Sequence, residues 1–196
     1  MIRKLVPALL LILSAPVLAQ DNTTPPLSPE DAAMMAAYQK AGAPGKQHAE
    51  LAKSAGDYTL SIRSWAKPDA APTEEHGTAT RKMTLDGRVL VESVQATMYG
   101  QPFTGHGMTG YDNVSEKWWS TWNDSMSTGL MVSDGTCDDE GACIFRGSWN
   151  DPVTRGKVSA RMETRWTNPD TEVFAMYGPG PDGKEYKMME MTYTRR

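Results

Sequence analysis

The chain has 196 residues and a formal net charge of −4, which is the length of one domain able to bury its own core. Phosphate binding depends on clustered Lys and Arg, so this acidic balance argues against nucleic acid as a partner. Beyond residue 19 there are only 6 Leu, 2 Ile, 8 Val and 3 Phe, a content of these residues as low as that of disordered chains. The same part of the chain contains 12 Met, 6 Trp and 7 Tyr. These large side chains recur in ordered alternation and predict a folded protein with a Met- and Trp-filled core.

The first 19 residues have the pattern of a secretory signal peptide. A basic start at Arg3 and Lys4 precedes an apolar run over 5–13, and Val17 and Ala19 lie three positions and one position before a cleavage site that follows Ala19. The apolar run is shorter than the roughly 20 residues that span a bilayer, and no later stretch approaches that length. We therefore expect a periplasmic or secreted protein with no membrane span after the signal is removed.

Two short helices are predicted next, after a polar, Pro-rich and flexible lead-in at 20–28. Ser28 is a helix N-cap and Pro29 suits the first helical position, while Gly42 ends this helix. A second helix begins at Pro44. The helical part of the chain thus covers residues 29–54.

From Asp57 the apolar residues recur with a period of two, and turn residues interrupt them about every ten positions. Connections this short join antiparallel neighbours and leave no room for crossover helices. The predicted fold is all-β: an antiparallel up-and-down barrel of about ten strands, with the two helices against one end, forming a single domain over 29–196. A β-sandwich is the alternative. The predicted strands lie near 57–65, 75–83, 88–99, 103–111, 117–125, 129–136, 143–149, 157–167, 171–178 and 184–195.

Both cysteines, Cys137 and Cys143, flank a turn-like segment, so we predict a disulfide across a hairpin. The alternative is a metal or redox pair. Five intervening residues differ from the two-residue spacing of thioredoxin-like and zinc-knuckle pairs, which favours the structural disulfide.

Several sequence blocks resemble the bacterial domain-of-unknown-function family 1579. They include Gly-Gln-Pro-Phe at 100–103, Gly-Tyr-Asp-Asn at 110–113 and Thr-Trp-Asn-Asp-Ser at 121–125, and the resemblance covers nearly the whole mature chain. Asp86 stands where the family's Gly-Gly-Arg turn has its first Gly, and Asp tolerates turn geometry. The resemblance implies a calycin-like β-barrel and brings no established activity.

Few residues carry a pattern typical of chemistry. His106 lies between Gly105 and Gly107, which would let a ligand or another backbone approach closely. Trp122 and Asp124 are two apart on one strand and point the same way. An inward Asp124 needs a partner, and Arg88, Arg161 and Arg165 are the candidates. Such a pair would close the barrel end as an internal ion pair or, alternatively, anchor a polar-headed ligand.

Methionines are spread over most predicted strands. Thioethers can hold Cu(I), but filling a core is the commoner use of Met, and we expect no cofactor and no metal. The leading hypothesis is a protein that binds a small hydrophobic or amphipathic ligand in its barrel interior, rather than an enzyme. The alternatives are a cell-envelope structural or interaction module without a cavity, and a hydrolase or isomerase using Asp124 and His106. The candidate ligand-binding residues are Arg88, Tyr99, His106, Trp122, Asp124, Met131 and Arg161.

Overall fold

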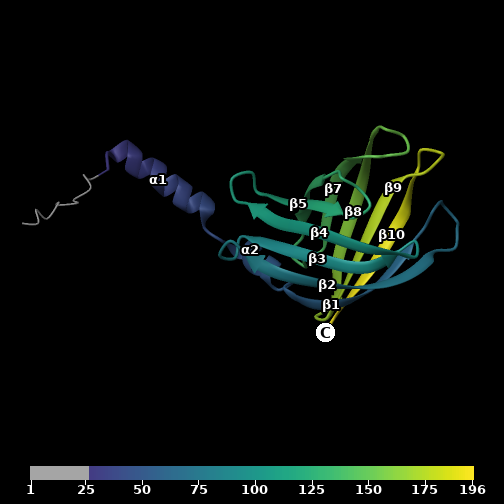
Figure 1. The fold of residues 1–196 in the computed structure, drawn as a ribbon. Coiled ribbons are helices and arrows are strands. Elements are labelled where there is room, and N and C mark those ends of the chain that lie inside the picture. Colours follow the sequence, from purple (N-terminus) through teal and green to yellow (C-terminus); the bar gives the residue numbers. More distant parts are fainter. Residues whose placement is uncertain (1–26) are drawn as a thin grey trace, which may run out of the picture.

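A computed structural model describes residues 27–196, and both the predicted signal peptide and most of the lead-in lie outside this range. Two helices precede ten strands (Figure 1). The helices are α1 (Pro29–Gly42) and α2 (Lys46–Ala52). The strands are β1 (Gly56–Ser64), β2 (Thr73–Thr84), β3 (Val89–Met98), β4 (Gln101–Asp112), β5 (Lys117–Asp124), β6 (Met131–Cys137), β7 (Cys143–Asn150), β8 (Lys157–Asn168), β9 (Thr171–Pro179) and β10 (Glu185–Arg195).

Every strand pairs antiparallel with its neighbours in the chain, and β1 pairs with β10 to close a barrel. The predicted up-and-down barrel is therefore confirmed, and the sandwich alternative is wrong. The period of two predicted the strands because alternate residues of each strand point into the barrel. In β1, for example, Tyr58, Leu60 and Ile62 are buried and the residues between them are exposed.

The inward residues of β1 form the centre of the core. They pack with inward residues of β2, β3 and β10, and most side chains of this core are aliphatic. The predicted Met- and Trp-filled core is therefore wrong here, because the core contains one methionine and no tryptophan, and Trp122 and Met191 pack around it only partly buried. Its buried members are Tyr58, Leu60, Ile62, Ala79, Val94, Met98 and Tyr193.

The barrel has two different ends. At the helix end lie α2, the β2–β3, β4–β5, β6–β7 and β8–β9 turns, and the C-terminus; the other five connections lie at the loop end. Helix α2 covers the helix end through the buried side chains of His48 and Leu51. The His48 ring packs edge-on to Tyr111 at 6.1 Å between centroids, and its Nδ1 accepts a hydrogen bond of 3.0 Å from the Gly45 amide.

Helix α1 does not pack against the barrel, so the expectation that both helices lie against one end is wrong for α1. It begins as the sequence predicts, with Ser28 Oγ accepting from the Asp31 amide at 3.1 Å, but it buries no residue and extends away from the strands (Figure 1). Its connection to the barrel is at its C-terminal end, where Arg88 Nε donates to the Gly42 carbonyl at 2.8 Å and Asn113 Nδ2 donates to the Ala41 carbonyl at 2.8 Å. Its apolar residues form no stripe that a sheet could cover. Over residues 27–196, no helix is long and apolar enough to cross a membrane.

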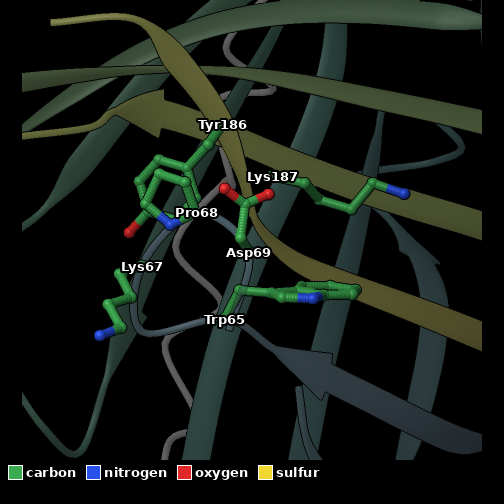
Figure 2. Close-up of a pocket in the computed structure, with 6 residues that line it drawn as sticks. All are labelled: Trp65, Lys67, Pro68, Asp69, Tyr186 and Lys187. Carbon is green, nitrogen blue, oxygen red and sulfur yellow. The ribbon is translucent and has the colours of Figure 1, made fainter. Parts of the chain in front are cut away.

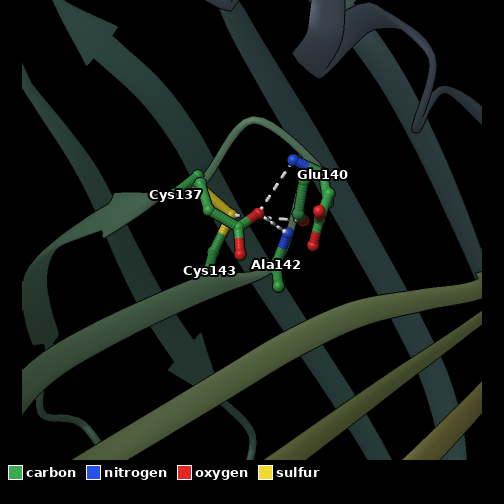
Figure 3. Close-up of a disulfide and its surroundings, with 6 residues drawn as sticks. Cys137, Glu140, Ala142 and Cys143 are labelled. Atoms are coloured by element: carbon green, nitrogen blue, oxygen red, sulfur yellow. Dashed lines mark hydrogen bonds between the residues drawn. A yellow bond between two sulfur atoms is a disulfide. The ribbon is translucent and has the colours of Figure 1, made fainter.

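The predicted disulfide joins Cys137 at the end of β6 to Cys143 at the start of β7 (Figure 3). The carboxylate of Asp138 organises the turn between them, since its Oδ1 accepts from the Glu140 amide at 3.0 Å and the Ala142 amide at 2.9 Å. This hydrogen bonding explains why an acidic segment forms a tight connection here.

We expect the double substitution C137S/C143S to lower the free energy of unfolding by about 2 kcal/mol, because the bond closes only a short loop in the unfolded chain. Urea denaturation of the oxidised protein and the variant measures the difference. An unchanged midpoint would contradict a stabilising role for the bond.

Candidate functional site

A buried ion cluster occupies the interior at the helix end. Arg81 on β2 bonds to Glu92 on β3, with Nε 2.7 Å from Oε1, and its Nη1 also bonds to Glu172 on β9. The guanidinium lies over the rings of Tyr193, 4.2 Å from the centroid, and Tyr58, 5.2 Å from the centroid. One cation thus ties together β2, β3 and β9 across the barrel.

Burial and charge oppose each other at Arg81. Burial alone would lower the pKa of its guanidinium, but the carboxylates of Glu92 and then Glu172 outweigh burial and raise that pKa well above its usual value. Burial also raises the pKa of Tyr193 and of Tyr58. Arg81 therefore stays charged and both tyrosines stay neutral near pH 7.

The ion cluster closes the barrel base rather than offering a binding group. Tyr58 donates its hydroxyl to the Ser54 carbonyl at 2.8 Å, and Arg195 donates to the Ala55 carbonyl at 2.7 Å, which fixes the segment after α2 beneath the cluster. Sequence reasoning missed this cluster. The available signal was strand parity, because Arg81 shares a face with the buried Ala79.

The interior changes character toward the loop end. Inward-facing side chains here are large and apolar, and they keep part of their surface exposed while several of them pack against the edge of the buried core. We call this set of partly exposed, inward-facing side chains the loop-end lumen. Its members are Phe103, Trp122, Met131, Met176, Met189 and Met191.

Packing and a hydrogen bond fix the position of Trp122 in the lumen. Its indole lies flat on β4, where a side chain at Gly105 would overlap the ring, and it stacks on Phe103 with an interplanar angle of 18°. Its Nε1 donates to Asp124 Oδ2 at 2.9 Å. The glycines that flank His106 thus make room for a tryptophan of the chain itself.

Trp122 and Asp124 do share the inward face, but the structure brings Asp124 to none of Arg88, Arg161 and Arg165. Its other hydrogen bond comes from the Met126 amide at 2.9 Å. Arg88 lies on the β2–β3 turn, and Arg161 lies on the outer face of β8 above the Tyr177 ring. The proposed Asp–Arg anchor does not form because strand parity puts Arg161 on the other side of the sheet.

The residues named for a catalytic pair do not converge either. His106 faces outward, opposite Asn123, and its Nδ1 lies 3.1 Å from Ser93 Oγ. Asp124 faces inward from the neighbouring strand, so the two groups are on opposite sides of the sheet. Tyr99 is 65% exposed on the β3–β4 turn. Of the predicted ligand-binding residues, the lumen contains Trp122, Asp124 and Met131.

Two further polar groups, which sequence reasoning missed, lie on the inward face at the loop end. Glu75 on β2 is 8% exposed and Ser64 on β1 is 6% exposed. Glu75 Oε2 and Ser64 Oγ have no hydrogen-bond partner, and Glu75 Oε1 accepts only a long bond of 3.4 Å from the Gly100 amide.

Two open pockets lie outside the lumen at the same end. One, of about 320 Å³, lies between the β1–β2 loop and β10 (Figure 2). Its Lys67 and Lys187 extend to opposite sides of Asp69 in this view, so they do not converge on an anion. The other, of about 340 Å³, lies beside the β9–β10 loop. Within the part of the chain that the structure describes, no cluster of three His, Cys, Asp or Glu residues could hold a metal ion.

The fold and the site define an antiparallel ten-stranded barrel with a buried ion cluster at one end and partly exposed apolar side chains toward the other. The chain belongs to the family described as "Protein of unknown function (DUF1579)", whose model matches residues 43–195. No protein with a curated description matches it.

Two structures illustrate the solved proteins that share this fold. Rv2717c from M. tuberculosis matches with a TM-score of 0.60 at 12% identity, covering 79% of this chain and 99% of its own. The S-type phycobiliprotein lyase CPES from Guillardia theta matches with a TM-score of 0.54 at 12% identity, covering 81% of this chain and 96% of its own. At such identity these matches show the fold alone.

We expect Arg81→Met to destabilise the protein by about 3–5 kcal/mol, because it leaves two carboxylates buried without a counter-charge. Arg161→Met is the matched control. Arg161 also bonds to two glutamates, Glu163 and Glu185, but on the outer face, where such pairs contribute less than about 1 kcal/mol. Denaturant unfolding of both variants measures the contrast, and equal losses would contradict the role assigned to Arg81.

The raised pKa of Tyr193 predicts a loss of stability in alkali. An unfolded tyrosine ionises near pH 10, whereas Tyr193 keeps its proton when folded, so the free energy of unfolding falls as the pH rises above about 10. Below that pH Tyr193 is protonated in both the folded and the unfolded state, so it does not change the free energy of unfolding with pH. Tyr193→Phe should flatten the fall between about pH 10 and 11, as measured by denaturation at each pH; an unchanged slope would refute the assignment.

Proposed function

We propose that this protein binds a small hydrophobic or amphipathic ligand in the loop-end lumen. The observation that carries the proposal is the partial exposure of inward-facing Trp122, Phe103 and Met131. Apolar side chains that line a concave interior without filling it are typical of ligand sites. The barrel shared with a phycobiliprotein lyase is compatible with such a role.

The chemistry of the lumen suits a guest of variable shape. The Trp122–Phe103 stack offers a rigid apolar wall. Methionines such as Met189 and Met191 face it from the β10 side, and their unbranched side chains adapt to irregular surfaces. Asp124 is already engaged with Trp122 Nε1 and so helps to hold that wall in place.

A second candidate function is an interaction role for α1. Met34, Met35 and Tyr38 are 51%, 45% and 72% exposed on a helix that buries none of its residues. Deleting residues 20–41 tests this candidate separately, because the deletion leaves the lumen intact. Loss of self-association or of a partner, with unchanged probe binding, would support the interaction role.

We also propose that the protein acts in the periplasm or outside the cell, after cleavage behind Ala19. The Cys137–Cys143 disulfide supports this compartment, since such bonds persist in oxidising surroundings. The N-terminus of the protein purified from a periplasmic extract tests the site. Gln20 is the expected first residue, and an intact Met1 would contradict the proposal.

The lumen proposal is tested with a neutral naphthylamine fluorophore. We expect a saturable rise in its emission, and Trp122→Ala should weaken binding by at least about tenfold because the apolar wall is lost. Trp119→Ala is the matched control, since Trp119 is on the same strand but faces outward over Gly110. Circular dichroism checks that both variants fold. Absence of saturable binding to the native protein would contradict the proposal.

A further inference from the structure

We propose that the ligand carries a primary ammonium group and that this group lies against Glu75 at the inner edge of the loop-end lumen. This inference rests on the proposed function and adds the chemical class of the ligand to it. Three observations support it: the unpartnered polar atoms, their neighbours, and the distribution of charge over the inward faces.

Glu75 is a buried carboxylate that the protein leaves without a counter-charge. It faces inward on β2, opposite Ile62 of β1, and is 8% exposed. Its Oε2 has no partner and its Oε1 has one long bond, from Gly100. An unpaired buried carboxylate lowers stability, so its presence points to a function in binding.

Ser64 adds a second acceptor beside it. Ser64 lies two residues beyond Ile62 on the same inward face of β1, and its Oγ is also buried without a partner. An ammonium group has three N–H donors and no acceptor. A carboxylate and a hydroxyl on adjacent strands could satisfy two of those donors.

The charges on the inward faces exclude the opposite ligand class. Glu75 and Asp124 are the acidic groups facing the interior at the loop end. The inward-facing bases of residues 27–196, Arg81 and Arg195, lie at the helix end. Arg81 is held between two glutamates, and Arg195 donates to main-chain carbonyls. A carboxylate or phosphate ligand would therefore meet repulsion in this lumen and no cation.

Access to Glu75 requires a side chain to move, because Oε2 and Ser64 Oγ have no exposed surface. Met189 is the cross-strand partner of Ser64 on β10. Its flexible thioether can rotate without breaking a hydrogen bond of the barrel. The amine would then lie against the two polar atoms.

The test uses three dansyl probes of equal alkyl length that end in an ammonium, a methyl or a carboxylate group. We expect the ammonium probe to bind at least about tenfold more tightly than the methyl probe, and the carboxylate probe to bind most weakly. Glu75→Gln should bring the ammonium probe to within about threefold of the methyl probe. It should leave the thermal midpoint unchanged or raise it, because an unpaired buried charge is removed.

Glu74→Gln is the matched control, since Glu74 is exposed on the outer face one residue away and should leave the probe order unchanged. Equal affinity for all three probes, or tightest binding of the carboxylate probe, would overturn this inference and leave the proposed function standing. Failure of all three to bind would overturn the proposed function itself. The comparison on the native protein stands even if Glu75→Gln fails to fold.

Discussion

The Arg81 guanidinium, held between Glu92 and Glu172 and covered by two tyrosine rings, constrains the rest of this barrel. Glu92 is on the adjacent strand, but Glu172 reaches Arg81 from β9, two strands beyond the closure between β1 and β10. The cluster can form only when the barrel is closed in its native register. It therefore fixes the helix end of the barrel, where Tyr58 bonds to the segment after α2.

Because the ion cluster holds the helix end in place, the loop end can be lined by adaptable side chains. The chain is poor in branched aliphatic side chains, and the inward positions toward the loop end hold Met and aromatic residues instead. Branched side chains pack with defined rotamers, whereas thioethers adapt to their surroundings. The β1-centred core and the ion cluster thus hold the barrel together. The loop-end lumen is the region in which Met and aromatic side chains replace Leu, Ile and Val, and it is the adaptable part of the interior.

Much of the fold follows from local sequence, and much of the site does not. The period of two, the turn residues and the Cys137–Cys143 spacing predicted ten strands and a hairpin disulfide, since these depend on neighbours in the chain. Parity also placed Trp122 and Asp124 on one face. Parity alone could not say which face of a strand is inward, so Arg161 and His106 were grouped with residues on the other side of the sheet. The burial of Glu75 without a counter-charge is visible only in the closed barrel, so the local sequence could not predict it.

The most direct test of the central claim follows the methionine methyl groups by NMR while the neutral fluorophore is added. If the loop-end lumen is the binding site, the methyl signals of Met131, Met176, Met189 and Met191 shift with one common dissociation constant. Those of Met34 and Met35 on α1 and of Met108 on the outer face of β4 stay in place. Shifts confined to the exposed methionines, with the inward ones unmoved, would contradict an accessible lumen.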